Sequence, residues 1–219
     1  MNLRLIRRYR NRLSRTSGLL KNNPVVALGM TMPFVIVPTL SLKAGLLMSA
    51  FLAAATIPSA VLASLVGRKI PPLFSLPFYG AVSTGCVLLL RFCVSGQALL
   101  LEDLGVYVPL AAFNGMMLEL ALVHPRRRVP DALHDAVMMC FGFLLVAAFL
   151  SALREFLGSG SLWGVPLTAP IRIRGLVLPF SGFILIGFLS ALFRRVDSII
   201  IGRMLRASRR TAKQGGDAV

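Results

Sequence analysis

Charge is scarce in this sequence, and acidic residues are scarcer still. Of 219 residues only 15% are charged, with 8 Asp and Glu against 24 Lys and Arg, while 56% are hydrophobic. Soluble domains carry roughly 25% charged residues, so a soluble globular enzyme is nearly excluded. Disorder is excluded as well, because disordered chains are poor in large apolar residues. The mean hydropathy of +0.78 therefore indicates an integral membrane protein.

Cysteine is also sparse, and its spacing suggests no metal site. Cys86, Cys93 and Cys140 lie inside apolar runs without a C-x-x-C pair, so we interpret them as buried small hydrophobic residues. The sequence contains no P-loop, no G-x-S-x-G and no H-E-x-x-H motif. We therefore predict no catalytic residue and no metal ligand in this chain.

Six apolar stretches of about 19–23 residues follow one another, each long enough to cross about 30 Å of hydrocarbon as a helix. Helices are required because backbone groups in lipid have no water to bond. The fold class we predict is an all-α integral membrane protein with six transmembrane helices. The predicted spans are 24–42, 44–66, 73–94, 104–123, 132–153 and 175–193.

The basic residues predict the orientation of these spans. With both termini in the cytoplasm, 19 of the 24 basic residues are cytoplasmic, and the external ones are Lys43, Arg91, Arg154, Arg172 and Arg174. The predicted organisation is a basic cytoplasmic segment at 1–22, a membrane domain at 23–195 and a basic cytoplasmic tail at 196–219. Basic segments of this kind attract anionic lipid headgroups, so we expect the lipid bilayer as a partner and no nucleic acid.

The first and fourth stretches contain residues that interrupt helices. The first holds Pro24, Gly29, Pro33 and Pro38, and the fourth holds Gly105, Pro109, Asn114 and Gly115. Because six spans divide into two triplets of opposite direction, this pattern predicts a 3+3 inverted repeat with helices 1 and 4 broken. The breaks near 30–33 and 114–115 are the predicted crossing, since unwound backbone at membrane depth must pack in protein or line a cavity. Two kinked helices packed for shape alone are the alternative.

Few ionisable residues lie within the spans. Glu119 sits about one turn from the cytoplasmic end of the fourth stretch and is costly there unless paired or hydrated. It either takes part in an ion or proton step or reaches the interface to meet His124 or Arg126. Arg154 and Glu155 close the fifth stretch and are expected to reach the external interface as a pair.

Four segments resemble those of one known family, and they occur in its order from about residue 21 to 195. These are Lys21-Asn22-Asn23-Pro24 with Gly29 and Pro33; Gly105-Val106-Tyr107-Val108-Pro109-Leu110 with Asn114; Ala152-Leu153-Arg154-Glu155-Phe156-Leu157-Gly158-Ser159-Gly160-Ser161-Leu162; and Leu178-Pro179 through Ile186-Gly187. The segment 152–162, with Arg154, Glu155, Gly158 and Gly160, is the most specific. Together they resemble the Rnf/Nqr D/E-type membrane subunits, and most closely the Rnf E or Nqr D type.

The resemblance implies a subunit of an ion-translocating electron-transport complex in the bacterial cytoplasmic (inner) membrane. Such complexes oxidise NADH or reduced ferredoxin and move sodium or protons. The implied partners are other membrane subunits, including a paired six-helix subunit and flavin-carrying subunits. The chain itself is at most a non-catalytic subunit of this oxidoreductase.

The sequence departs from the family at its iron site. Members place a cysteine before the proline of helix 1 and after the asparagine of helix 4, and two subunits together hold an iron–sulfur centre. The corresponding residues here are Met32 and Gly115, so no cofactor is assigned to this chain. We expect Met32, Pro33, Asn114 and Gly115, with Glu119 nearby, to form the crossing or ion path. The alternatives are a small secondary transporter that binds a solute at the crossing, and a purely structural subunit.

Overall fold

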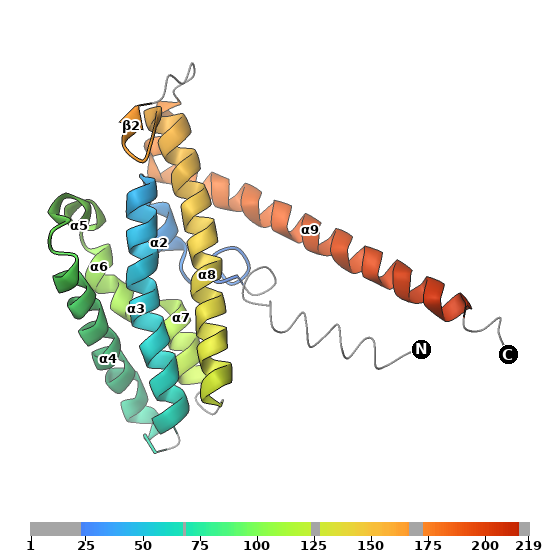
Figure 1. Cartoon of the computed structure of the whole chain (residues 1–219), viewed down its shortest axis with the longest axis horizontal. Helices are drawn as coiled ribbons and strands as arrows, with labels where there is room; N and C mark the ends of the chain where they lie inside the picture. The colour runs from blue at the N-terminus through green and yellow to red at the C-terminus, as the bar shows by residue number, and fades with distance from the viewer. Residues whose placement is uncertain (1–22, 68, 124–127, 167–172, 215–219) are drawn as a thin grey trace.

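The computed structural model describes residues 23–67, 69–123, 128–166 and 173–214, and its regular structure is almost entirely helical (Figure 1). The strands of the described part are β1 (Ser161–Leu162) and β2 (Val165–Pro166), which form one short antiparallel hairpin. The prediction of a mostly helical chain is therefore confirmed.

Four long helices carry the predicted second, third, fifth and sixth stretches. They are α3 (Leu42–Val66), α4 (Pro72–Cys93), α8 (Val129–Arg154) and α9 (Pro179–Gln214), and a π-helical turn, η3 (Glu155–Ser159), extends α8. Each contains a segment long and apolar enough to cross a membrane. The apolar stretches therefore predicted these four helices correctly, because each stretch is continuous.

The first and fourth stretches are built differently. Residues 24–31 form turns, and only α2 (Met32–Ile36) is helical before α3 begins. The fourth stretch is a series of short elements: α5 (Ala98–Leu104), α6 (Tyr107–Leu110), the 3-10 turn η1 (Ala111–Phe113), α7 (Gly115–Leu118) and the π-helical η2 (Glu119–Val123). α5 and the following helical segment are bent by 69° at their junction. The described residues thus contain four helices long and apolar enough to span a membrane, or five if this bent pair is one span. The count of six spans with an inverted repeat stays a prediction.

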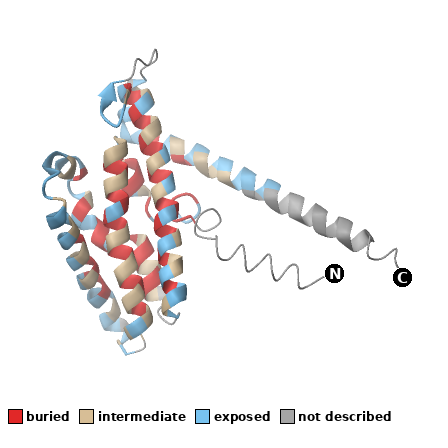
Figure 2. Cartoon of the chain, in the orientation of Figure 1, coloured by how far each residue is buried: buried red, intermediate tan, exposed pale blue. Residues whose placement is uncertain are grey.

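α3 and α8 form the centre of the molecule and pack along each other, with α4 against α3 (Figure 1). Half of the apolar segment of α3 and of α8 is buried, compared with 22% for α4 and for α9. Figure 2 shows the buried residues concentrated on α3, α8 and the short segments between them. The outer faces of α4 and α9 expose Leu and Phe side chains, which suits a chain surrounded by lipid or by other membrane subunits.

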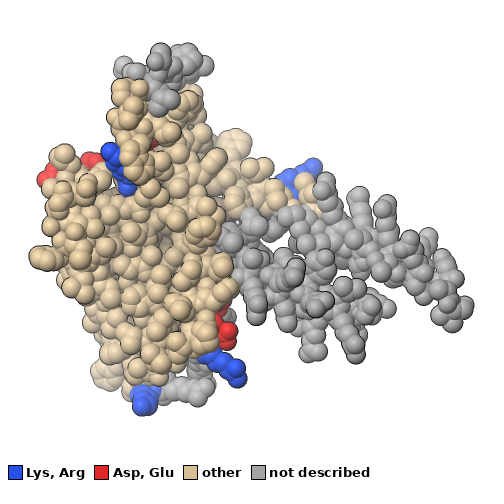
Figure 3. Space-filling model, viewed as in Figure 1, with Lys and Arg blue, Asp and Glu red and all other residues tan. Residues whose placement is uncertain are grey.

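Charged side chains avoid the middle of this helical body. In the view of Figure 3, the described Lys, Arg, Asp and Glu residues lie toward its ends, and the surface between them is almost uncharged. This distribution fits a multi-pass membrane protein, because a charge at the bilayer centre is costly.

α9 continues past the predicted end of the membrane domain at residue 195. Its 36 residues measure about 54 Å at a rise of 1.5 Å per residue, more than the roughly 30 Å hydrocarbon core. The predicted tail therefore begins as a continuation of the last helix, while segment 1–22 lies outside the described residues.

Candidate functional site

Asn114 interrupts the fourth stretch and holds both sides of the break. Its backbone is extended, with φ −93° and ψ 156°, and its side chain is fully buried. The Oδ1 atom accepts a hydrogen bond of 2.9 Å from the Met117 N–H, and Nδ2 donates one of 2.8 Å to the Ala111 carbonyl. Asn114 is thus the N-cap of α7, a position at which asparagine is strongly preferred, and it also bonds Ala111 at the start of η1.

One further polar side chain connects this break to the central helices. The Thr56 hydroxyl of α3 donates to Asn114 Oδ1 at 3.3 Å. Cys140 lies on α8 directly after Met139, which belongs to the same buried cluster as Met116 of α7. The Thr56 and Cys140 side chains are both buried. Cys140 was correctly predicted to be buried. The contact between Thr56 and Asn114 was missed, since no sequence signal relates positions 56 and 114.

The other two cysteines, Cys86 and Cys93, lie on α4. Cys86 is partly exposed and Cys93 is exposed in the isolated chain. The prediction that all three cysteines are buried is therefore wrong for Cys93, because an apolar stretch predicts a helix and not which face of that helix the protein covers.

The first stretch is also ordered by an asparagine. Asn23 Oδ1 accepts from the Val25 and Val26 N–H groups at 3.0 and 3.1 Å, and Nδ2 donates to the Gly142 carbonyl of α8 at 3.0 Å. Gly29 then takes a left-handed conformation with φ +67°, which glycine adopts without steric cost. The chain is thereby turned and fastened to α8 before α2 begins.

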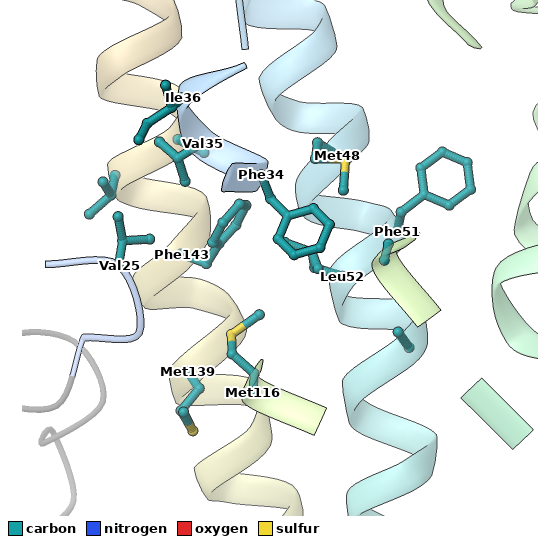
Figure 4. Packing of buried hydrophobic residues seen from close by; sticks show 14 of the residues in the cluster. Val25, Phe34, Val35, Ile36, Met48, Phe51, Leu52, Met116, Met139 and Phe143 are labelled. Carbon is teal, nitrogen blue, oxygen red and sulfur yellow. The ribbon is translucent and has the colours of Figure 1, made fainter. Parts of the chain in front are cut away.

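The two interrupted segments touch at Gly115. A Cβ atom built on Gly115 would lie 2.6 Å from Met30 Cβ and 3.0 Å from the Met30 carbonyl oxygen. Phe34 of α2 and Met116 of α7 belong to one buried hydrophobic cluster, in which Phe34 lies beside Phe143 of α8 (Figure 4). The direct neighbour of Gly115 is therefore Met30.

The remaining predicted crossing residues are less enclosed. Met32 is half-buried and packs against the hydrophobic cluster, whereas Pro33 is exposed in the first turn of α2. Between Met30 and Met32, the Thr31 side chain is fully buried, and its hydroxyl has no hydrogen-bond partner among the described residues.

Glu119 lies in η2, four residues beyond Gly115, where that turn packs against α3. The side chain is half-buried, and its Oε2 atom is inaccessible to solvent without a hydrogen-bond partner in the described part of the chain. The predicted partners His124 and Arg126 lie outside the described residues. A buried carboxylate oxygen is costly in a membrane helix unless it is paired or hydrated.

The crossing does not fit an iron–sulfur centre held by this chain. Gly115 offers no ligand atom, and the space beside it is filled by Met30. A thioether such as that of Met32 does not replace the thiolates that normally bind such clusters. Within the described ranges there is also no group of three or more His, Cys, Asp or Glu side chains placed to bind a metal ion.

At the end of α8, Arg154 is 1% exposed and donates only to backbone carbonyls. Its Nη1 atom bonds the Ile36 carbonyl of α2 at 2.5 Å, Nε bonds Leu176 at 3.0 Å, and Nη2 bonds Val177 at 3.1 Å. Longer contacts of 3.5 Å reach the carbonyls of Thr39 and Leu178. The guanidinium therefore joins the end of α2 to the 3-10 turn η4 (Arg174–Val177), which leads into α9.

Glu155 is 3% exposed and faces a different set of partners. Its Oε2 accepts from the Leu42 N–H at the start of α3 at 2.7 Å, and Oε1 accepts from the Gly164 N–H of the hairpin at 2.8 Å. An anion at a helix N-terminus is favourable. The prediction that Arg154 and Glu155 reach the interface as a pair is wrong, because each instead satisfies backbone groups of converging loops.

Backbone conformation and close packing require the two glycines of this segment, Gly160 and Gly158 respectively. Gly160 has φ +68°, and a Cβ on Gly158 would lie 3.0 Å from Val177 Cγ2. Beyond them, Trp163 and Gly164 both have positive φ at the tip of the hairpin, where Lys43 Nζ lies 5.8 Å from the Trp163 ring centroid. We define the Arg154 junction as Arg154 and Glu155 with the backbone groups that they bond.

Comparison with known proteins agrees with this architecture. A family model described as "Rnf-Nqr subunit, membrane protein" matches residues 13–190. The chain is 30% identical over 205 residues to the E subunit of the ion-translocating oxidoreductase complex of Shewanella loihica, covering 85% of this chain and 88% of that protein. The proteins of the same name from Shewanella piezotolerans and Shewanella amazonensis are 31% and 33% identical, over 205 and 150 residues. The alignment with the Shewanella piezotolerans protein covers 85% of this chain and 88% of the relative. The alignment with the Shewanella amazonensis protein covers 67% of this chain and 64% of the relative.

Proposed function

Because this chain belongs to the Rnf-Nqr family of membrane subunits, we propose that it acts as the E subunit of an ion-translocating oxidoreductase complex. The observation that carries this function is the match, along most of both chains, to proteins named as that component of such a complex. Four long apolar helices support it, since such a subunit must lie in a membrane. A solute transporter is not favoured, because the relatives compared above carry the name of a complex subunit.

Within this function, we place the two interrupted segments at the centre of six spans arranged as an inverted repeat, with both termini in the cytoplasm. The contact between Met30 and Gly115 supports this arrangement, since it joins the first segment of one half to the first segment of the other. The bend of 69° in the fourth stretch supports it too. The distribution of basic residues supports the orientation and the inner-membrane location.

We further propose that this chain carries no iron centre of its own at the crossing. The absence of room beside Gly115 supports this, because even a thiolate introduced there would displace the Met30 backbone. The role left to the crossing is to support neighbouring subunits and to shape the path of ions or electrons. In this proposal the chain is a non-catalytic subunit.

Affinity purification of the tagged chain from native membranes tests the proposed function. We expect flavin-carrying subunits and a second six-helix membrane subunit to co-purify with it in fixed proportion. Material prepared in parallel from cells with the untagged chain is the control. Recovery of the chain alone, combined with stabilisation against heating by a small solute, would instead indicate a transporter.

The ion-path role of Glu119 predicts a transport defect without unfolding. Glu119→Gln keeps the size of the side chain but removes its charge, so we expect ion pumping by the complex to slow by roughly tenfold, about 1.4 kcal/mol in barrier height. Pumping is measured in proteoliposomes energised by the electron donor. Glu102→Gln is the matched control, since Glu102 is exposed on α5. Unchanged pumping in the Glu119 variant would remove this residue from the path.

A further inference from the structure

The structure assigns to Arg154 a role in the geometry of the crossing: we propose that it is a positioning residue that holds the end of α2 and so keeps Met30 against Gly115. The hydrogen bonds of Arg154 do not reach the crossing themselves. α2 connects the two places, because Ile36 at its end is bonded by Arg154 and Met30 lies just before its start. An effect of Arg154 on electron or ion transfer rests on the proposed function, whereas its effect on the position of Met30 does not.

α2 depends on contacts with the rest of the protein for its position. It has five residues, far fewer than the 12–15 that an isolated helix needs for even marginal stability. Its start is placed by the packing of Met30 on Gly115. Its end is placed by Arg154 and by Gly182 of α9, where a Cβ would lie 3.1 Å from Ile36 Cγ2. Release of the second anchor therefore leaves α2 itself held by apolar packing, while Asn23 still bonds the residues before it to the Gly142 carbonyl of α8.

The geometry of these bonds requires an arginine. Three different nitrogen atoms donate to carbonyls from two separate loops, at Ile36, Leu176 and Val177. A planar guanidinium presents five N–H groups in a fixed fork, whereas a lysine ammonium is a compact point charge. No carboxylate lies within 4 Å of Arg154 among the described residues, so the carbonyl oxygens carry the interaction. A glutamine at this position would lose both the charge and most of the donors.

A purely structural role for Arg154 would affect only the junction. The native cysteines distinguish the two possibilities. Cys140 is 8% exposed, and the preceding residue Met139 belongs to the same buried cluster as Met116 of α7, which follows Gly115. Cys140 lies 14 residues before Arg154 on the same helix, about 21 Å away along the axis. Its reactivity therefore reports on the crossing rather than on the junction, and Cys86 and Cys93 on α4 serve as references in the same molecule.

The experiment measures N-ethylmaleimide labelling of each cysteine by mass spectrometry in complexes held in native membranes. We expect Arg154→Gln to raise the labelling rate of Cys140 by about tenfold, because local opening exposes a buried thiol. Arg154→Lys should raise it less, and Cys86 and Cys93 should label at the parent rate in both variants. Arg91→Gln is the control, since Arg91 is an arginine in the last turn of a different helix, α4.

If neither Arg154 variant accumulates in membranes, Gly182→Ala tests the same anchor. Its added methyl group presses on Ile36 from α9, so it too should raise Cys140 labelling. Parent-like labelling of Cys140 in Arg154→Gln, or in Gly182→Ala when that variant has to be used, overturns the proposal. Since labelling needs no electron transfer, this result is independent of whether flavin-carrying subunits co-purify with the chain.

Discussion

Replacing Gly115 with alanine is expected to destabilise the protein by about 3 kcal/mol, at the upper end of the usual cost of overpacking. The new methyl group would lie 2.6 Å from Met30 Cβ and 3.0 Å from the Met30 carbonyl oxygen. Relief requires movement of backbone, since neither atom is the end of a flexible side chain. In a chain of this size we expect the apparent unfolding midpoint to fall by roughly 6–12 °C, measured in detergent through the fluorescence of Trp163.

Two other glycines provide matched controls for this variant. A Cβ on Gly85 of α4 or on Gly187 of α9 would meet no atom within 4 Å. Since alanine is favoured over glycine within helices by up to about 1 kcal/mol, Gly85→Ala and Gly187→Ala should be neutral or slightly stabilising. A Gly115→Ala protein as stable as these controls would show that the two interrupted segments are not in contact.

The close packing beside Gly115 also predicts that an introduced cysteine there will not bind iron. Gly115→Cys, alone or with Met32→Cys, should lower stability further and should not yield iron or acid-labile sulfide in the purified chain. The thiol needs more room than the methyl group of alanine, and Met30 already fills the space beside Gly115. Iron at more than trace levels in the Gly115→Cys protein would contradict the proposal that this crossing is closed to a cluster.

Replacing Asn114 with alanine is expected to cost about 2–4 kcal/mol, combining the loss of an N-cap with buried groups left unpaired. The Met117 N–H, the Ala111 carbonyl and the Thr56 hydroxyl would all lose a partner. Water cannot replace the side chain at low cost, since the residue is fully buried. The measurement is again the unfolding midpoint, with an expected fall of roughly 5–15 °C.

Gln97→Ala is the control for this second variant. Gln97 is an exposed amide at the N-cap of α5 and makes no capping hydrogen bond there, so its removal should change the midpoint little.

The double variant Thr56→Val with Asn114→Ala tests the hydrogen bond between these two side chains. If Thr56 acts through Asn114, the two losses of unfolding free energy should be less than additive. Simple additivity would show that the hydrogen bond of 3.3 Å contributes no coupling energy.

The four long helices and the interruptions were predictable because both are local properties of the chain. A continuous apolar run of about 20 residues has few stable structures in lipid other than a helix. Pro33 lies in the first turn of α2, and Asn114 caps α7, positions that these residue types favour. The positions of α3, α4, α8 and α9 followed from the same reasoning, and the family followed from short motifs in their order.

The contacts between those segments were not predictable in the same way. Gly115 meets Met30 rather than Met32 or Pro33, and Thr56 of α3 donates a hydrogen bond to Asn114. Which face of a helix turns inward depends on neighbours distant in the sequence, and in an apolar helix no alternation of polar residues marks that face. The error for Arg154 and Glu155 has the same cause, since both charges are buried by loops from three parts of the chain.

The sequence by itself determined that this chain lies in a membrane, where its long helices run, where its backbone is interrupted and to which family it belongs. These properties depend on the residues of one segment at a time and on their transfer from water to lipid. Only the tertiary structure decided which side chains fill the space beside Gly115 and which carbonyls surround Arg154. Those outcomes depend on close packing and directed hydrogen bonds between segments far apart in the sequence, as between Ile36 and Arg154.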